Sequence, residues 1–511
     1  MSYSMYLCLS LATLPAGTAG EAAEPAPDLN DALQPVLDGI RRLVQAFRNH
    51  PVSPAAAARF ENELQQGLRQ LGRVTAQWTY NALEPATVPD LPQRVQYEGS
   101  PFRRLAQKTP QEVSTLFGPI TLHRRGYRAA PAVGAPVLFP LGRELGLVQG
   151  ATPAVVERVA RYQAEGGTTQ RQTLARLRRE HGLSWGVKRL RQVTAFVAAA
   201  VEEHRPGAQA EQVLRWLVQA QAARGRHRPV LAVGRDGITL GLQIKGFAIH
   251  EVATTGTLTV YDRRGRRLGT VYLAYTPESG QATMSAQLTQ LLTEVLRRWE
   301  GPLPRLCYVT DAGDNETTYY RKVLRRLRHP RTGRRLAWLW VLDYYHAAER
   351  LGTMAEALFG GGRLGWAWAR KMEKLLLKPA GVRRVLHSAA ALRWRRQLRG
   401  QRLAKFRRAY NYLRDRRQCL RYAVYRQQGV PLGSGVTEAA CKTVFTQRLK
   451  LSGMRWKKAG AQTILTLRVL LLSGVWDVVY ERMLLRSGET EVRTPGTLDR
   501  FAAEKRRKIG A

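Results

Sequence analysis

Three carboxylates stand at positions where strands and a helix would bring them together. Asp236 follows the apolar run VLAVGR, and Asp311 ends the buried run RLCYVTD. Glu438 falls in the first turn of a predicted helix that opens with the sequence GSG. Side chains at strand ends in an open α/β layer converge on one edge, where sites form. We therefore expect the three carboxylates to meet at that edge, although they are far apart in the sequence.

Carboxylates at such an edge suit metal-assisted chemistry on a phosphodiester. Mg²⁺ takes oxygen ligands and keeps several waters, so a few carboxylates and the substrate's phosphate oxygens are enough to hold it. Two such ions about 4 Å apart activate the attacking oxygen and stabilise the leaving one. We predict two Mg²⁺ ions, for which Mn²⁺ could substitute, held by Asp236, Asp311 and Glu438.

Two residues beyond the third predicted strand are further candidates. Asp343 ends the run LAWLWVLD, and His346 follows three residues later. We predict Asp343 as an additional metal ligand and His346 as a catalytic group. Ordinary explanations stay open for all these residues: an Asp-Gly pair can start a turn, an acid in a helix's first turn complements the helix dipole, and a histidine can pack in a core. Asp314 also competes with Asp311 for the second aspartate position.

The segments around these acids predict an α/β layer with mixed strand order. Short strands separated by turn residues follow one another from 229 to 275 and form an antiparallel meander. A helix over 282–299, the strand RLCYVTD, a helix over about 316–328 and the strand LAWLWVLDYYHA come next. We assign a catalytic domain to residues 208–346, and its second part, which contains the Glu438 helix, to 431–485.

A basic helical segment, residues 347–430, separates the two parts of this domain. Between Arg393 and Arg426 there are thirteen Lys or Arg residues and one acid, Asp415. We interpret the segment as an insertion that handles DNA beside the catalytic carboxylates.

Four regions precede the catalytic domain. Residues 1–27 predict a disordered leader, because the apolar start lacks the positive residues of a secretory signal. Apolar spacing broken at His50-Pro51 predicts a helical hairpin over 28–93, which either dimerises or contacts DNA. Residues 94–150 predict a small β-ribbon with a basic face formed by Arg124, Arg125 and Arg128. Residues 151–207 resemble a helix-turn-helix, with Ser184 as the N-cap of its second helix. After the catalytic domain, residues 486–511 are predicted to form a basic tail.

Basic residues on two of these elements are candidates for DNA contacts. One set lies on the second helix of the helix-turn-helix-like region, and the other follows Glu438. The candidates are Lys188, Arg189, Arg191, Arg448, Lys450 and Arg455, with Trp456 either stacking on a base or packing beneath its helix.

The composition points to a polyanionic partner. The 511 residues include 81 Lys and Arg against 39 Asp and Glu, which gives a formal net charge of +42 and a pI near 11.0. Such an imbalance repels itself in a compact fold, and nucleic acid is the commonest polyanion that neutralises it. No apolar run reaches the roughly 18 residues of a membrane span, so we do not expect a membrane partner. We also expect no small-molecule substrate. Four scattered cysteines without a C-x-x-C pair predict no disulfide framework, no zinc site and a reducing, cytoplasmic location at the nucleoid.

Four motifs, in order, resemble those of DDE transposases of bacterial insertion sequences, in particular the ISKra family. They are VGRDG, VTDAGDNE, LDYYHAAERL and GSGVTEAACKTVFTQRLKLSGMRW, the last being the most specific. The resemblance spans roughly residues 30–480. It implies an RNase H-like mixed-sheet catalytic domain with an all-helical insertion, preceded by helical and small β DNA-binding regions. It makes Asp236, Asp311 and Glu438 the catalytic triad, and Asp343 and His346 match a D-x-x-H motif of the family.

The chain departs from the family at one place. Family members carry a Cys pair after the tyrosine of the amino-terminal ribbon, where this chain has GYRAAPAVG. The ribbon is therefore expected to be held by packing alone, without zinc.

The expected function is that of a DNA transposase, which binds double-stranded DNA at the ends of its element and works as a homodimer or larger assembly on DNA. Asp236 would bridge two metals, with Asp311 and Glu438 each completing one site. Water would attack first, and the freed 3′-hydroxyl would then attack target DNA. Two alternatives stay open: a catalytically silent, domesticated DNA-binding regulator, and a structure-specific nuclease that cuts without joining.

Overall fold

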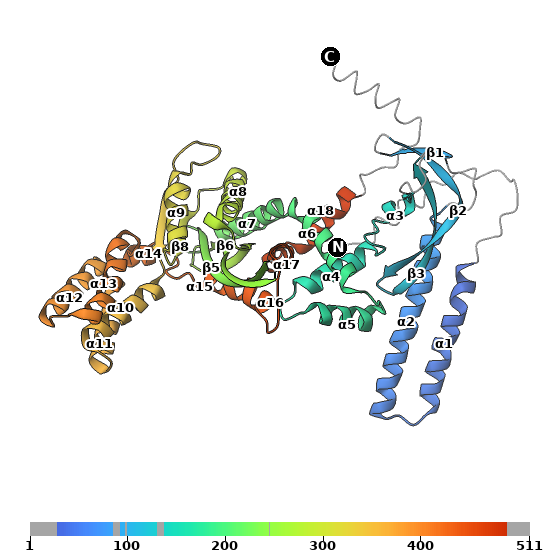
Figure 1. The fold of residues 1–511 in the computed structure, drawn as a ribbon, viewed down its shortest axis with the longest axis horizontal. Coiled ribbons are helices and arrows are strands. Elements are labelled where there is room, and N and C mark those ends of the chain that lie inside the picture. Colours follow the sequence, from blue (N-terminus) through green and yellow to red (C-terminus); the bar gives the residue numbers. More distant parts are fainter. Residues whose placement is uncertain (1–27, 85–91, 98–99, 130–136, 245, 488–511) are drawn as a thin grey trace, which may run out of the picture. The chain divides into compact units, whose positions relative to one another are not determined.

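A computed structural model describes residues 28–84, 92–97, 100–129, 137–244 and 246–487 of the chain (Figure 1). These residues form two compact units. The first contains the described residues up to Thr152 together with His181–Leu183, and the second contains Pro153–Glu180 and the described residues from Ser184 onward. The predicted leader, and all but the first two residues of the predicted basic tail, lie outside the described residues.

The first unit consists of a helical hairpin and a small antiparallel sheet. Its elements are α1 (Leu29–Asn49), α2 (Pro54–Ala82), β1 (Arg94–Tyr97), β2 (Ser100–Thr115), β3 (Gly118–Ala129), β4 (Val137–Leu138) and α3 (Pro140–Glu144), with the strands in the order β1-β2-β3-β4. The hydroxyl of Ser53 caps α2 by accepting a hydrogen bond from the Ala56 N–H at 3.1 Å. Side chains of Gln77 and Asn81 on α2 bond to the backbone of β3 and hold the hairpin on the sheet.

The basic face predicted for this sheet is wrong for two of its three arginines. Arg124 and Arg125 are only 8% and 6% exposed. The guanidinium of Arg124 lies 3.9 Å from the centre of the Phe139 ring, and Arg125 donates to the carbonyl of Ala106 at 3.0 Å. Both arginines therefore hold the unit together from within, and only Arg128 is exposed.

The second unit is built on one mixed five-stranded sheet. Its strands are β5 (Val230–Ile244), β6 (Phe247–Tyr261), β7 (Arg267–Tyr275), β8 (Arg305–Thr310) and β9 (Trp338–Leu342), in the order β7-β6-β5-β8-β9. β5, β6 and β7 are antiparallel neighbours, whereas β8 and β9 run parallel to β5. The predicted α/β class with mixed strand order is thus confirmed.

Helices cover both faces of this sheet. Those before β9 are α4 (Pro153–Ala164), α5 (Gln170–His181), α6 (Val187–Glu202), α7 (Arg205–Ala222), α8 (Ala282–Arg298) and α9 (Asp314–Lys322). Those after it are α10 (Tyr344–Phe359), α11 (Arg363–Leu376), α12 (Gly381–Arg395), α13 (Gly400–Asp415), α14 (Tyr422–Gln427), α15 (Gly435–Ala440), α16 (Gln447–Leu449), α17 (Lys458–Ser473) and α18 (Trp476–Ser487). Leu258 of β6 packs with α7 and α8, whereas its neighbour Thr257 meets α15, because successive strand side chains point to opposite faces.

Helices α10 to α14 form one helical block beside the edge strand β9, and this name is kept below. Two buried tyrosines of α14 fasten the block to that strand. The Tyr422 hydroxyl donates to the carbonyl of Leu342 at 2.9 Å, and the Tyr425 hydroxyl donates to the carbonyl of Trp340 at 2.8 Å. The almost wholly helical segment predicted for 347–430 is present.

Three local predictions were wrong. The run around Asp236 does not end at the Asp-Gly pair, because β5 continues to Ile244 and pairs with β6 along its whole length. The residues DYYHA belong to a helix rather than a strand, since β9 ends at Leu342 and α10 begins at Tyr344. Ser184 is not an N-cap, because α6 begins after Gly186.

The helix-turn-helix-like region is not a compact unit of its own. Residues 153–202 contain three helices, and α6 packs its apolar face on α4 and on the distant α17. Apart from His181–Leu183, these residues therefore belong to the same unit as the five-stranded sheet. Within the described residues, no single helix is long and apolar enough to span a membrane, and only the sharply bent pair formed by α17 and α18 passes that test jointly.

Candidate functional site

Asp236 and Asp311 occupy equivalent positions on two neighbouring parallel strands. β5 and β8 are paired as far as Gly234 and Val309, and each aspartate follows its strand's last paired residue by two positions. Because neighbouring strands lie about 4.8 Å apart, this register sets the two carboxylates side by side. Asp236 is still held in the sheet by β6, opposite Thr255, whereas Asp311 begins a loop.

The third carboxylate comes from a helix that lies directly on β5. The Thr437 hydroxyl of α15 is 2.8 Å from the Thr257 hydroxyl of β6. This contact passes over Gly234, where a Cβ atom would overlap the hydroxyl of Thr437. Only glycine permits so close an approach of helix and strand. Glu438, the next residue, is thereby brought over the strand that carries Asp236.

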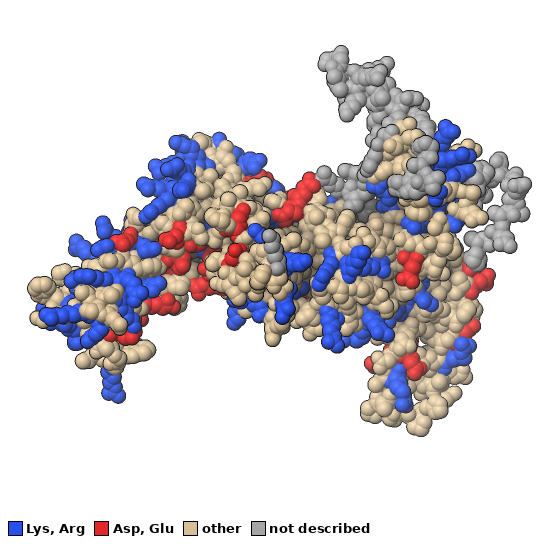
Figure 2. All heavy atoms as spheres, in the orientation of Figure 1, with Lys and Arg blue, Asp and Glu red and all other residues tan. Residues whose placement is uncertain are grey.

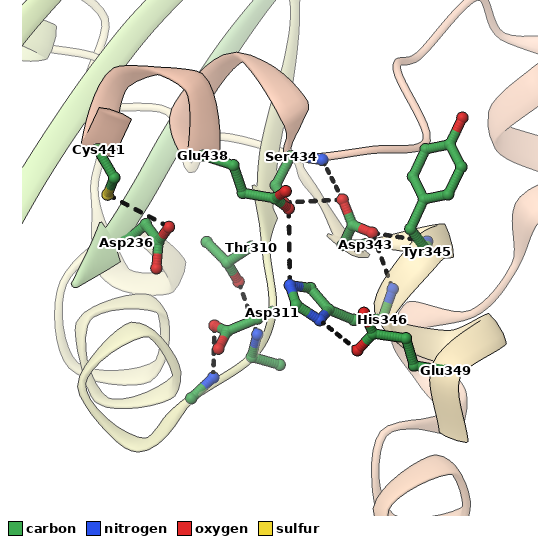
Figure 3. A network of polar contacts seen from close by, with 12 residues as sticks. Asp236, Thr310, Asp311, Asp343, Tyr345, His346, Glu349, Ser434, Glu438 and Cys441 are labelled. Atoms are coloured by element: carbon green, nitrogen blue, oxygen red, sulfur yellow. Dashed lines mark hydrogen bonds and ion pairs between the residues drawn. The ribbon is translucent and has the colours of Figure 1, made fainter. Parts of the chain in front are cut away.

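The charges of Asp311 and Glu438 act on the ionisation of Asp236. Burial raises the pKa of Asp236, and the negative charges of Asp311 and Glu438 raise it further. Figure 3 shows the three side chains arranged around the same region, each from a different element. The three acids therefore face the same region of the structure.

Each carboxylate is oriented by a local donor. One oxygen of Asp236 accepts from the Gly237 N–H at 2.7 Å, and its other oxygen lies 3.4 Å from the Cys441 thiol, which donates to it. Asp311 accepts from the Gly313 N–H at 3.0 Å through one oxygen. Among the described residues, the second oxygens of Asp311 and Glu438 have no hydrogen-bond partner.

This donor set fits a hard divalent cation in its chemistry. Carboxylate oxygens are the ligands that Mg²⁺ prefers, and mutually repelling carboxylates gain most from a cation between them. Among the described residues, however, no group of three or more His, Cys, Asp or Glu side chains is arranged so that it could hold a metal ion. Binding of a cation by all three acids would therefore require their side chains to rearrange, and the Glu438 side chain, 49% exposed, has room to do so.

A fourth carboxylate, which the sequence analysis did not assign, lies against this group. Glu316, in the first turn of α9, is only 7% exposed. Burial raises its pKa to about 6, and the charges of Asp311 and Asp236 act in the same direction. Its partial counter-ion is the buried Arg235, whose guanidinium lies 4.0 Å away. Its position five residues after Asp311, at the start of the next helix, was the available signal.

The loop after β8 is held by the helical block. Ala312 has φ of 57°, a left-handed conformation that is costly for a residue with a Cβ. Its carbonyl accepts two bonds from the Arg416 guanidinium, at 2.9 and 3.1 Å, and the Tyr412 hydroxyl of α13 donates to the carbonyl of Asp311. The block therefore fixes the second aspartate, while Asp314, the rival candidate, is exposed on α9.

Asp343 is not available as a metal ligand, which corrects its predicted role. It is completely buried and is the N-cap of α10, where one oxygen accepts from the N–H groups of Tyr345 and His346 at 2.6 and 3.0 Å. Its other oxygen accepts from the Ser434 N–H and, at 2.7 Å, from the Ser434 hydroxyl. A carboxylate with four donors on its two oxygens acts as a structural anchor.

Ser434 connects this anchor to the catalytic candidate Glu438. It lies 2.6 Å from a Glu438 oxygen through the same hydroxyl that contacts Asp343. His346 lies on the other side, with Nε2 3.6 Å from Glu438 and Nδ1 3.3 Å from Glu349 (Figure 3). Burial lowers the pKa of His346, but the Glu349 acceptor and the surrounding carboxylates raise it overall. His346 is thus placed to orient Glu438 and to balance its charge.

The structure corrects the role of Arg448, which was predicted to hold DNA phosphates. Its side chain is fully buried, and it donates to the carbonyl and the side-chain oxygen of Gln163 at 2.8 and 3.3 Å. Trp456 packs with the cluster beneath α17 and donates to the carbonyl of Leu449 at 3.0 Å. Arg448 and Trp456 thus join α16 to its neighbours, in line with the packing alternative given for the tryptophan.

The remaining DNA-binding candidates are accessible. Lys450 and Arg455 are exposed in the segment after α16, and Lys188 and Arg191 are exposed on α6. Arg191 donates to the side chain of Gln170 at 3.0 Å. The half-buried Arg189 lies over the Trp185 ring, 4.3 Å from its centre.

Comparison with known proteins does not assign the chain to a class. No protein-family model matches it, and no curated protein matches it.

Proposed function

We propose that this chain is a DNA transposase of the DDE type, which cleaves and joins DNA strands at the group formed by Asp236, Asp311 and Glu438. The observation that carries the proposal is the convergence of these three carboxylates, from two parallel strands and a helix, inside a strongly basic unit. Residues 153–489 contain 61 Lys and Arg against 24 Asp and Glu. Concentrated acids within such a surface favour a polyanionic substrate handled with divalent cations.

The mixed sheet supports an RNase H-like catalytic domain. A meander of three antiparallel strands is followed by two strands parallel to the first, and the glutamate arrives from a later helix. The helical block lies between β9 and α15 in the sequence, so we interpret it as the insertion of such a domain. Its contacts with the Asp311 loop give this insertion a part in shaping the site.

The residues of the site divide into ligands and positioning groups. Asp236, Asp311 and Glu438 would hold two Mg²⁺ ions, which when bound would polarise the phosphodiester and activate the attacking oxygen. Gly234 lets α15 approach the sheet, and Ser434 and His346 orient Glu438. Strand pairing and the Thr257–Thr437 hydrogen bond fix the helix that carries Glu438, and the half-exposed side chain of Glu438 has room to turn toward Asp236.

The surface of the helical block supports DNA binding beside the site. From Tyr344 to Gln427 there are 21 Lys and Arg against four Asp and Glu. Figure 2 shows Lys and Arg side chains gathered over α11 to α13. Trp366 and Trp394 on this block are 68% and 84% exposed. Exposed aromatic rings among cations provide stacking surfaces for bases together with phosphate contacts.

The decisive experiment measures cleavage and joining by the full chain. The substrate is labelled DNA carrying the sequences that flank the coding region, together with a supercoiled target plasmid and Mg²⁺ or Mn²⁺. We expect nicked donor and joined product, and a loss of about 100-fold or more in Glu438→Gln and Asp311→Asn. Asp314→Asn is the matched control, since it removes an exposed acid three residues away and should leave the rate unchanged.

Each other outcome selects an alternative. Tight DNA binding without cleavage in any metal would favour a DNA-binding regulator. Cleavage without joined product would favour a nuclease. Cleavage that persists unchanged in Glu438→Gln would refute the metal-site proposal.

A further inference from the structure

The helical hairpin of the first unit lacks a buried core of its own. In the part of the chain that the structure describes, no residue of α1 or α2 is buried. The two helices meet through a few apolar contacts, such as the Phe47 and Phe60 rings stacked 4.4 Å apart and Ile40 against Gly67. Two helices alone cannot enclose an apolar stripe, because each needs neighbours on both flanks.

Apolar side chains consequently remain accessible along the hairpin. Val44 on α1 and Leu68 on α2 are 38% and 53% exposed, and Val52 at the hairpin tip is 79% exposed. The apolar residues of α1 recur at helical spacing, so they form a continuous stripe: Leu33, Val36, Leu37, Ile40, Leu43, Val44 and Phe47. Ile40 and Phe47 of this stripe contact α2, and its accessible edge, which includes Val44, favours packing against further helices.

Charge identifies the kind of partner. From Asp28 to Glu84 the chain has six Lys or Arg and six Asp or Glu, so its net charge is zero in a molecule of +42. A neutral surface gains nothing from phosphate neutralisation, which dominates binding to DNA. Two copies of a strongly basic chain repel each other wherever residues 153–489 face one another, and the neutral hairpin is free of that repulsion.

We propose that the hairpin is a self-association surface, on which α1 and α2 of one chain pack against α1 and α2 of a second copy to form a four-helix bundle. A second hairpin supplies two helices of matching length and the same apolar stripe. The inference does not rest on the proposed function, because it concerns the chain in the absence of DNA.

The test measures the mass of the full chain in solution by sedimentation equilibrium or light scattering without DNA. We expect a dimer, and in Val44→Glu/Leu68→Glu a rise in the dimer dissociation constant of about 100-fold or more, because two carboxylates would be buried in an apolar contact. Both side chains are exposed within one chain, so circular dichroism should show unchanged helix content. The matched control, Gln45→Glu/Gln66→Glu, adds the same charge at neighbouring exposed polar positions and should leave the dimer intact.

Salt dependence gives a second, independent readout. An apolar, neutral interface should hold or strengthen as ionic strength rises from about 0.1 to 0.5 M, since salt screens the repulsion between the basic units. A monomeric wild-type chain, or a dimer unaffected by Val44→Glu/Leu68→Glu, would overturn the proposal. A monomer whose DNA affinity falls in the same variant would instead make the hairpin a DNA-contacting element.

Discussion

Replacing Gly234 by alanine tests whether the close approach of α15 to β5 is what places Glu438. The added Cβ would overlap the Thr437 hydroxyl and crowd Thr257, the two groups that join the helix to the sheet at 2.8 Å. Neither neighbour is the flexible end of a long side chain, so the helix itself must shift. The substitution thus moves the carboxylate without changing any charge.

The expected cost has two parts. Overpacking of a well-filled contact costs about 1–3 kcal/mol, and the Thr257–Thr437 hydrogen bond is worth about 1 kcal/mol. Gly234→Ala should therefore lower the free energy of unfolding by about 2–4 kcal/mol. A displacement of Glu438 by even 1 Å or so would reduce strand cleavage by about 100-fold, which exceeds the effect of the stability loss on an enzyme that remains folded.

Chemical denaturation and the DNA cleavage assay read the two effects separately. Gly435→Ala is the control on the same helix, because a Cβ there meets no atom within 4 Å. Alanine in that helix should be neutral or stabilising. In a Thr257→Ala/Thr437→Ala background, Gly234→Ala should cost at least about 1 kcal/mol less, because the atoms it overlaps are gone.

Gly234→Ala and Gly435→Ala should differ in both stability and cleavage rate. The cost of Gly234→Ala should also differ between the two backgrounds, and equal values in either comparison would contradict these expectations. Either result would mean that the approach of α15 to β5 is not limited by the missing side chain.

Substitutions of three buried charged residues, with one exposed lysine as a comparison, test the roles given to these charges. Asp343→Asn should destabilise the chain by about 2–3 kcal/mol, because it places an amide against the donors of Ser434, while the number of Mn²⁺ ions bound in a titration stays the same; fewer ions would restore Asp343 as a ligand. Arg448→Ala should cost about 2–4 kcal/mol in denaturation and leave the salt dependence of DNA binding unchanged, whereas Lys450→Ala should make that dependence less steep. The raised pKa of Glu316, about 6 against an ordinary 4.5, means that the folded state disfavours its ionisation, so its contribution to stability declines as pH rises from about 4.5 to 6. Glu316→Gln should remove up to about 2 kcal/mol of that decline, which paired unfolding curves across this pH range measure; parallel curves would contradict it.

The main catalytic candidates were predictable because they depend on features that local sequence records. An apolar run that ends in an acid predicted the end of β8, which lies one residue before Asp311, and parallel pairing then sets Asp311 beside Asp236. Glu438 was found because a glycine-rich opening and an acid in the first turn are typical of a helix start. The α/β class with mixed strand order followed from the alternation of the same segments.

The errors came from interactions between segments that are distant in sequence. The Asp-Gly pair at 236–237 predicted a turn, yet pairing with all of β6 keeps the strand continuous. Arg124, Arg125 and Arg448 were assigned to the surface because arginine is usually exposed, whereas their partners are a ring and oxygen acceptors from other elements. Glu316 was missed because its position at the start of the helix after Asp311 does not by itself show that its side chain is buried.

The contacts of Ser434 explain how the helical block can lie between β9 and α15 in the sequence without displacing Glu438. The block begins at Asp343, the N-cap of α10, and the chain returns from it at Ser434, which binds the same carboxylate. The entry and exit of the block are therefore fastened at a single buried residue. Because Ser434 also contacts Glu438, the glutamate is positioned by the point at which the block closes. Movement of the block would thus be transmitted to Glu438 through Asp343 and Ser434.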